Sequence, residues 1–267
     1  MGEVRPNMSS FRQKLKLLLS LAKMDLRKQY LGTYLGLLWS LLMPLTTIVL
    51  IYFVMTYGLK AGRLESVDFV YWLIPGMLIW FFVSESIGKS VGVIVEHSYL
   101  VTKMRFPLRL LVPARILACL PVHGLLMLLF LAASWAGGGL VLSVYWLQCG
   151  YYILCAFGLT LGISLLTSAV NVFIRDAANI VGVILQIMFW VTPLFWEARM
   201  IAQSRLSFLL YSPFNYVVSG YRDSLFRDTG FWVHPKETLA FWGLTIFFLV
   251  AGTVLFRRLQ PHFADVL

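Results

Sequence analysis

The triplet Gly88-Lys89-Ser90 resembles the end of a phosphate-binding loop. Such a loop needs another glycine five residues before its second glycine, and this chain has Val83 there. The triplet also lies in an apolar stretch typical of a membrane helix, not at the turn after a strand. We therefore exclude a nucleotide site on this chain and expect no bound cofactor. We expect that the chain cannot hydrolyse ATP by itself.

Glu85 and Lys89 are charged residues inside an apolar stretch, spaced i and i+4. This spacing places them on one helix face, where they can form an ion pair. Charges inside a membrane are costly and tend to face protein or water, so a pore-lining role stays open as the alternative.

Other reactive side chains form no recognisable catalytic or metal-binding pattern. His123 lies alone in an apolar stretch, which favours a hydrogen-bonded structural histidine. Cys119, Cys149 and Cys155 match no zinc or redox spacing and are expected to be small buried hydrophobes. The sequence has neither Gly-x-Ser-x-Gly nor His-Glu-x-x-His, which argues against an enzyme, and we assign no catalytic and no metal residues.

Apolar stretches long enough to cross a bilayer dominate the chain. Hydrophobic residues make up 60% of the sequence, whereas roughly 45–50% is usual in soluble domains. A membrane helix needs roughly 20 apolar residues. The sequence predicts an all-α membrane protein with six transmembrane helices, at about 33–58, 69–95, 108–136, 144–170, 177–197 and 238–257.

The fifth predicted span differs from a simple membrane anchor. No charge occurs between Asp176 and Glu197, but Gln186 and the pair Thr192-Pro193 lie inside this stretch. The polar segment 171–176 precedes it. This composition indicates a helix that touches something polar and bulky within the membrane.

The net charge of +10 is distributed by position along the chain. Basic residues cluster before the first span and between the second and third spans. The loops near 60–68 and 137–139 carry no excess of positive charge. The positive-inside rule then places both termini in the cytoplasm and argues against nucleic acid as the partner. We divide the chain into a cytoplasmic N-terminus with an amphipathic helix (1–30), a transmembrane domain (31–258) and a cytoplasmic tail (259–267).

Two segments next to the membrane have helical patterns of their own. Residues 11–27 repeat apolar side chains at helical spacing with cations on the other face, which is typical of a helix in the membrane interface. This helix could be only an anchor, or also a docking surface for a cytoplasmic partner. Residues 96–107 predict a short cytoplasmic helix that ends before Pro107.

The segment before the last span is apolar in pieces too short to cross a bilayer. We expect residues 203–228 to form a re-entrant periplasmic helix pair broken at Pro213. The alternative is two helices lying flat on the outer surface.

Aromatic residues make up 15% of the chain, and many lie inside the predicted spans. Belts at the membrane interface, lipid-facing positions or the core could explain some of them. An aromatic passage suits a sugar chain, because the CH-rich faces of sugars can lie against rings while hydroxyl groups stay hydrated. The candidates for lining such a passage are Phe53, Tyr57, Trp80, Phe81, Phe189 and Trp190.

Several motifs, taken in order, resemble the membrane subunits of ABC exporters for bacterial cell-surface polysaccharides. This family includes permeases for O-antigen, capsule and teichoic acid. The resemblance covers nearly the whole chain and is closest to the O-antigen type. The motifs are Tyr30 with Leu35-Gly36 and Trp39 up to Pro44, Trp80-Phe81-Phe82 with Ser84 and Ser86, 100–107, Asn171-Val172-Phe173 with Arg175-Asp176 continuing to Thr192-Pro193, and Ser212-Pro213-Phe214-Asn215 with Gly220-Tyr221-Arg222.

The resemblance implies a homodimer around a central channel in the bacterial inner membrane, driven by two ATP-binding subunits that carry the ATP and Mg. The cargo would be a lipid-linked polysaccharide. The residues expected to contact the ATPase are Lys23, Arg27, Tyr99, Leu100, Lys103, Met104 and Arg105. The residues expected at a periplasmic gate are Tyr211, Pro213, Asn215, Tyr221 and Arg222.

The function we expect is therefore that of a channel-forming permease subunit, not of an enzyme. Two alternatives stay open. One is an ABC permease for a small drug or lipid, and the other is a membrane-embedded enzyme acting on lipid-linked sugar.

Overall fold

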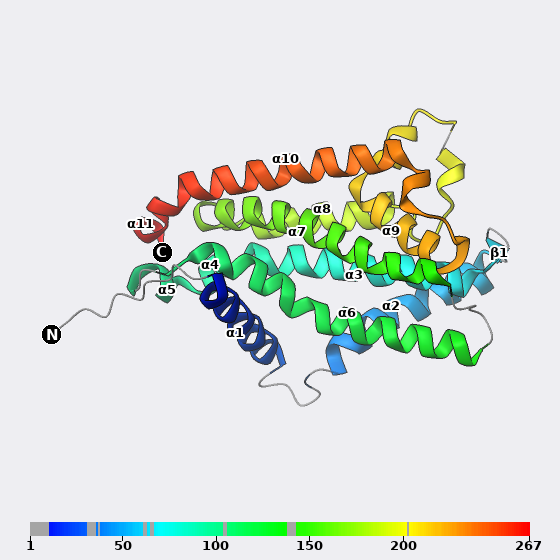
Figure 1. Ribbon diagram of the computed structural model, residues 1–267, viewed down its shortest axis with the longest axis horizontal. Coiled ribbons are helices and arrows are strands. Elements are labelled where there is room, and N and C mark those ends of the chain that lie inside the picture. The colour runs from blue at the N-terminus through cyan, green and yellow to red at the C-terminus, as the bar shows by residue number, and fades with distance from the viewer. Residues whose placement is uncertain are drawn as a thin grey trace.

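The computed structural model describes residues 11–30, 36, 38–60, 63–64, 67–103, 106–137, 143–201 and 203–267, and nearly all of them are helical (Figure 1). The α-helices are α1 (Phe11–Tyr30), α2 (Leu38–Phe53), α3 (Phe69–Val91), α4 (Val93–Glu96), α5 (Ser98–Lys103), α6 (Leu111–Ala136), α7 (Gln148–Phe173), α8 (Ala177–Val191), α9 (Pro213–Arg222), α10 (Pro235–Leu259) and α11 (Phe263–Val266). The one departure from an all-α fold in the described residues is a short antiparallel pair of strands, β1 (Arg63–Leu64) and β2 (Val67–Asp68), with Arg63 opposite Asp68.

Short 3-10 and π segments extend or connect these helices. The π-helices are η1 (Val54–Gly58) and η6 (Asp223–Arg227), and the 3-10 helices are η2 (Leu108–Leu110), η3 (Val144–Leu147), η4 (Ala198–Ile201), η5 (Ser207–Tyr211), η7 (Phe231–Val233) and η8 (Gln260–His262). The helix α5 confirms the predicted short helix before Pro107, and α1 confirms the predicted N-terminal helix.

Five helices in the described residues are long and apolar enough to cross a membrane: Leu38–Gly58, Phe69–Val91, Leu108–Ala136, Val144–Phe173 and Pro235–Val266. They correspond to five of the six predicted spans. The stretch predicted as the fifth span, 177–197, contains α8, which has 15 residues. At 1.5 Å per residue α8 is about 22 Å long, which is shorter than the roughly 30 Å hydrocarbon core.

The end of α8 has a local cause. Thr192 has an extended backbone (φ −73°, ψ 136°), and Pro193 follows it. Proline disfavours helical conformation in the residue before it, so the helix stops at Val191 and the chain continues without α-helix to η4. Our boundary at residue 197 was therefore wrong for the helix itself.

The helix α3 is the centre of the bundle and packs against α2, α6, α7, α8 and α9 (Figure 1). Leu73, Met77, Ile79 and Val83 on α3 are fully buried. The helices α2 and α8 instead leave apolar side chains exposed. These are Leu42, Met43, Val49, Leu50, Phe53 and Val54 on α2 and η1, and Ile180, Val183, Ile184, Ile187 and Trp190 on α8.

The helices α7 and α10 cross at a contact that only glycine permits. A methyl group on Gly162 would lie 2.7 Å from the backbone nitrogen of Leu249. A methyl group on Gly252 would collide with the carbonyl oxygen of Gly162. Since both obstacles are backbone atoms, they cannot rotate away as a side chain could. Small residues at such crossings let the backbones of membrane helices approach closely.

We expect Gly252→Ala to lower the free energy of unfolding by about 1–3 kcal/mol, because α10 must move away from α7. Gly243 lies on the same helix with open space around the corresponding position, so Gly243→Ala is the matched control. Melting temperatures of the purified variants in one detergent test this. Equal melting of the two variants would contradict the close crossing.

Candidate functional site

The helix α1 packs along α6 with one face and exposes cations on the other. Leu21 and Ala22 are buried, whereas Lys23 and Arg27 are exposed. Lys23 and Arg27, two of the residues expected to contact the ATPase (the predicted coupling residues), therefore lie on an exposed surface of the chain.

A buried ionic cluster joins α1 to α4 and α6. The carboxylate of Asp25 lies 3.2 Å from Nε of Arg115 and 3.7 Å from Nε2 of His97. Arg115 also donates from Nη2 to Oε2 of Glu96 at 2.5 Å. Asp25, His97 and Arg115 are 3%, 2% and 7% exposed.

This cluster is costly unless it is complete, because a buried charge must be compensated by a partner. Asp25 is the acidic member supplied by α1, Arg115 belongs to α6, and Glu96 and His97 lie at the turn before α5. The cluster therefore joins the basic amphipathic helix α1 to the turn that precedes α5.

Sequence reasoning missed Asp25, although a signal existed. Asp25 is the one acidic residue within α1, and it follows Leu18, Leu21 and Ala22 on the apolar face of that helix. A lone carboxylate on an apolar face needs a buried cation, and its partner could not be identified before the fold was known.

The predicted coupling residues around α5 divide into surface and core. Tyr99 is 46% exposed, whereas Leu100 is buried within the chain. We therefore leave Leu100 out of the contact surface. The side chain of Lys103, and Met104 and Arg105 altogether, lie outside the described residues.

A groove of about 530 Å³ runs between α2 and α3. Trp39 and Phe81 line it together with Glu85 and Lys89, which form the predicted ion pair. Both charged side chains are partly exposed. The ion pair is confirmed, and its position in a groove keeps the alternative pore-lining role compatible with the fold.

The six predicted lining rings occupy different environments. Phe53, Tyr57 and Trp190 are 59%, 67% and 61% exposed in the single chain. Phe81 and Phe189 are half-buried. Trp80 is 3% exposed and packs against Phe189 and Phe214, so it belongs to the core of the chain and we leave it out of the lining.

Arg222 is a buried anchor at the end of the bundle that carries α9. Its guanidinium group donates to the carbonyl oxygens of Trp72 (3.1 Å), Pro193 (2.7 Å) and Leu194 (2.7 Å). The group also lies over the Trp72 ring, 3.5 Å from the ring centroid. Gly76 leaves room for it, since a methyl group there would lie 2.7 Å from Nη2. Arg222 thus ties α9 to α3 and to the chain just after α8.

Tyr221 is a second buried anchor on α9. Its hydroxyl group lies 2.9 Å from Nε2 of His123, and Nδ1 of His123 lies 3.3 Å from the carbonyl oxygen of Leu78. His123 is therefore a hydrogen-bonded structural residue, as its position in an apolar helix predicts. Tyr221 and Arg222, both predicted at the gate, hold α9 in place from inside the chain.

The other predicted gate residues lie on or before α9. Pro213 is its first residue, and Tyr211 precedes it with 46% exposure. Asn215 donates from Nδ2 to the carbonyl oxygen of Leu210 (2.8 Å) and accepts from Ser219 (3.2 Å). The first member of the expected helix pair is the five-residue 3-10 helix η5, and the second is α9.

Comparison with known proteins now identifies the family. A family model described as ABC-2 type transporter matches residues 16–226. The chain belongs to the ABC-2 type transporter family. It is similar to an O-antigen export system permease protein of Klebsiella pneumoniae, with 26% identity over 254 residues that cover 94% of this chain and 95% of the relative. It is also 26% identical over 256 residues to a protein of the same name from Myxococcus xanthus, covering 93% and 94% of the two chains.

The resemblance inferred from the motifs is thereby confirmed. This ABC-2 permease is a multi-pass membrane protein of an ABC exporter, homologous over nearly its whole length to permeases named for O-antigen export. The matched region includes the ionic cluster around Asp25, the groove between α2 and α3, and all of α9.

Proposed function

We propose that this ABC-2 permease exports a lipid-linked cell-surface polysaccharide, of the O-antigen or capsule type, from the cytoplasm to the periplasm across the bacterial inner membrane. The observation that carries the proposal is the similarity of the whole chain to permeases named for O-antigen export. The exposed rings Phe53, Tyr57 and Trp190 support it, because ring faces suit the CH-rich faces of sugars.

The proposed transporter is a homodimer, with the passage between the two copies. Support comes from the apolar faces that α2 and α8 leave exposed in the single chain. Exposed apolar patches of this kind mark contacts with lipid or with protein. The first turns of α2 and α8 would pack against the second copy. Phe53, Tyr57 and Trp190, which lie at the C-terminal ends of these helices and in η1, would then face the passage.

The proposed topology has six membrane crossings with both termini in the cytoplasm. Five crossings correspond to the long helices, and α8 with the irregular segment after it forms the sixth. Non-helical backbone is tolerated at membrane depth where protein or water covers it. The carbonyl oxygens of Pro193 and Leu194 satisfy this condition, because Arg222 donates to them.

The energy source is two copies of a separate ATP-binding subunit, which hold the ATP and Mg. We place their contact at the exposed cations of α1, such as Lys23 and Arg27, and at the exposed ring of Tyr99. The ionic cluster around Asp25 joins these two surfaces, so that both respond to the same movement of the ATPase.

Deletion of the gene in the source cell tests this function. We expect lipid-linked polysaccharide to accumulate on the cytoplasmic side and to disappear from the cell surface, and a plasmid copy should reverse both effects. Loss of a small drug or lipid substrate from the surface, with normal surface polysaccharide, would instead favour the alternative transport function.

The exposed rings should act together. We take a contact between a ring and a sugar as comparable to a contact between two aromatic rings, about 0.5–1.5 kcal/mol, so single alanine changes at Phe53, Tyr57 or Trp190 should slow export modestly. The triple change should slow it far more without lowering the melting temperature. Trp80→Ala is the contrast, because cutting a large buried aromatic residue to alanine costs about 3–5 kcal/mol. Export loss that merely follows the melting temperature in all variants would contradict a lining role.

A further inference from the structure

The helix α1 leaves an apolar stripe exposed beside the face that packs into the chain. Leu21 and Ala22 are buried on the packed face. Phe11, Leu15 and Leu19 are 79%, 43% and 56% exposed. These three residues are spaced four apart, so they form one stripe along the helix. The first half of α1 thus presents a surface of large apolar side chains outside the bundle.

Cations lie next to this apolar stripe. Arg12 and Lys16 are exposed and each directly follows a member of the stripe. Asp25, the one acidic residue of the helix, is 3% exposed and lies 3.2 Å from Arg115 inside the chain, so it offsets little of the positive charge at the surface. The exposed charged residues of α1 are all basic: Arg12, Lys14, Lys16, Lys23, Arg27 and Lys28.

The buried ionic cluster fixes the position of α1 along the bundle. Arg115 lies near the start of Leu108–Ala136, and Glu96 and His97 lie shortly after Phe69–Val91, and both of these helices are long enough to cross a membrane. Figure 1 shows α1 oblique to α3 and α10, at the end of the bundle that carries α4 and α5. Asp25 therefore holds α1 at the level where two membrane-crossing helices enter or leave the bilayer, beside the lipid headgroups.

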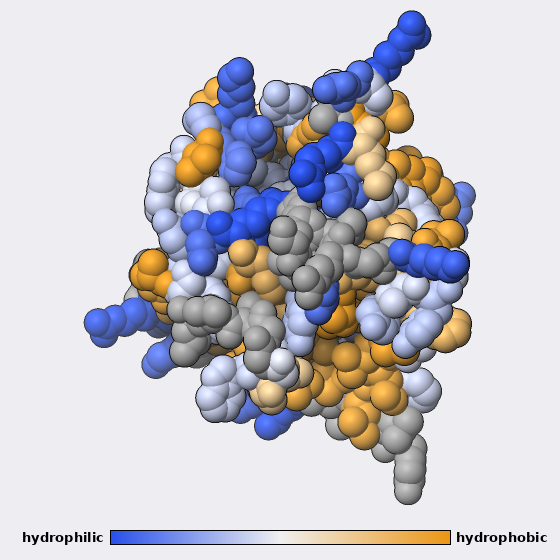
Figure 2. Space-filling model, turned by 90° about the vertical axis from the view of Figure 1, so that its right-hand side faces the viewer, coloured by the Kyte–Doolittle hydropathy of each residue, from blue (hydrophilic) through white to orange (hydrophobic). Residues whose placement is uncertain are grey.

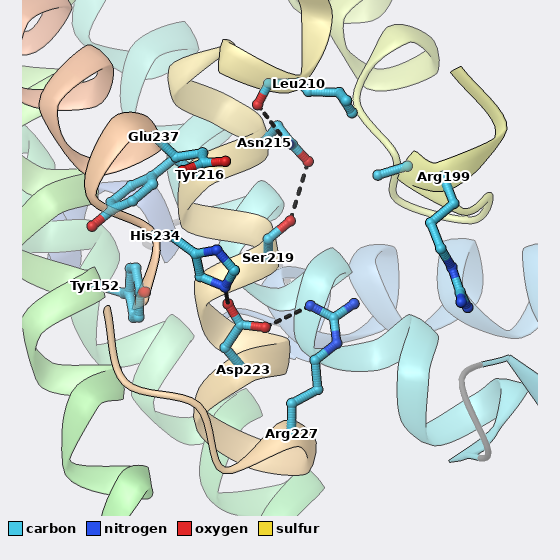
Figure 3. A pocket seen from close by; sticks show the side chains of 11 residues that line it. Tyr152, Arg199, Leu210, Asn215, Tyr216, Ser219, Asp223, Arg227, His234 and Glu237 are labelled. Atoms are coloured by element: carbon cyan, nitrogen blue, oxygen red, sulfur yellow. Dashed lines mark hydrogen bonds and ion pairs between the residues drawn. The ribbon is translucent and has the colours of Figure 1, made fainter. Parts of the chain in front are cut away.

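The opposite end of the bundle has a different surface. Figure 2 faces that end, where hydrophilic and hydrophobic side chains are mixed. The cavity drawn in Figure 3 lies there, and its Arg227 is paired with Asp223 at 2.5 Å. Arg199 is likewise paired with Glu197, at 3.0 Å. These cations have carboxylates beside them, whereas α1 contributes cations alone to its exposed surface.

The two neighbouring stripes of α1 distinguish between classes of partner. A nucleic acid or a purely acidic surface would leave Phe11, Leu15 and Leu19 in water, and a purely apolar surface would leave the cations without counter-charge. A bilayer that contains anionic phospholipid satisfies both stripes. Its acyl chains surround the apolar side chains, and its phosphate groups attract the cations.

We propose that the first half of α1 is a binding surface for anionic phospholipids, with the apolar stripe among the acyl chains and Arg12 and Lys16 at the phosphate groups. The second half carries Lys23 and Arg27, which we assign above to the ATPase contact. The inference goes beyond the proposed function and does not depend on the exported substrate. Only the leaflet, the cytoplasmic one, follows from the proposed topology.

The lipid neighbours of α1 can be identified in the purified full-length permease. A bimane fluorophore is attached to Leu15→Cys in a background in which Cys119, Cys149 and Cys155 are alanine. The nanodiscs contain equal amounts of phosphatidylglycerol and phosphatidylcholine, and the acyl chains of one lipid or the other carry bromine, which quenches the fluorophore on contact. Each basic residue near an anionic surface gives roughly a fivefold preference, so we expect brominated phosphatidylglycerol to quench about tenfold more strongly than brominated phosphatidylcholine.

A second label position tests which side of α1 faces the lipid. Gln13 is exposed and lies two residues from Leu15, which places it on nearly the opposite side of the helix. Bimane on Gln13→Cys should be quenched little by either lipid. Equal quenching at the two positions would contradict an oriented contact of α1 with the bilayer.

Charge variants test the preference for anionic lipid. Arg12→Gln with Lys16→Gln should lower the tenfold quenching ratio toward one. Arg205→Gln with Lys236→Gln is the matched control, because it removes two exposed cations at the α9 end and should leave the ratio unchanged. All four side chains are exposed, so both double variants should melt as the parent protein does.

The remaining outcomes would overturn the inference. Equal quenching by the two lipids at Leu15→Cys would mean that α1 does not select anionic lipid. No quenching by either lipid would mean that another partner, such as the ATP-binding subunit, occupies the apolar stripe. A quenching ratio that survives the loss of Arg12 and Lys16 would remove these cations from the contact. Because no polysaccharide and no ATPase are present, each of these results leaves the proposed function standing.

Discussion

Asp25→Leu should destabilise the protein by about 3–5 kcal/mol, the cost of leaving one member of a buried ion pair without its partner. The variant leaves Arg115, 7% exposed, with Glu96 as its remaining carboxylate within the described residues. It also removes the carboxylate nearest His97. The export rate should fall by more than the loss of folded protein accounts for, because α1 is no longer fixed to the turn before α5.

A double variant separates charge from shape. Asp25→Leu with Arg115→Met removes both buried charges and should recover much of the lost stability, since apolar replacement of a complete buried pair is often neutral. Glu96 can then remain solvated, because its side chain is 52% exposed. Lys23→Leu, on the exposed face of α1, is the matched control and should melt as the wild type does. A double variant no more stable than Asp25→Leu would contradict the ionic cluster.

Arg222→Leu should lower the free energy of unfolding by roughly 3 kcal/mol or more. It removes the donor from three carbonyl oxygens, and each buried acceptor left unsatisfied costs about 1–3 kcal/mol. It also removes the cation that lies over Trp72. Without this anchor, the chain after α8 and the helix α9 lose their connection to α3.

Two further variants test whether geometry or charge matters at this position. Arg222→Lys keeps the charge but cannot reproduce the planar donor fork, so it should fall between the wild type and Arg222→Leu. Arg205→Leu, whose side chain is exposed, is the surface control and should change little. Melting temperatures in detergent and export in cells give the comparison. An Arg222→Leu protein that melts like the control would show that the three carbonyl contacts contribute little.

The spans were predictable because hydrophobic length alone identifies them, and five of the six stretches are long apolar helices. The boundary of α8 was missed although Pro193 was visible in the sequence. A long uncharged stretch does not show where its helix ends. Here the proline effect on Thr192 ended the helix before the hydrophobic stretch did.

The environments of individual residues were less predictable, because they depend on contacts between distant segments. Trp80 and Trp190 look alike in sequence, yet one is 3% and the other 61% exposed. Arginine is usually a surface residue. Arg222 is buried and acts as an anchor only because α3 and the chain after α8 approach it. Asp25 could have been flagged from its apolar face, but not paired with Arg115.

Reconstitution tests the central claim most directly. The permease and its ATP-binding subunit are placed together in proteoliposomes with a lipid-linked, radiolabelled polysaccharide, and the fraction of polymer protected from an external glycosidase is followed over time. We predict that ATP changes this fraction only when both proteins are present, and that the Phe53, Tyr57 and Trp190 triple alanine variant slows the change. ATP-driven movement of a small lipid or drug, with the polymer left where it began, would contradict polysaccharide export.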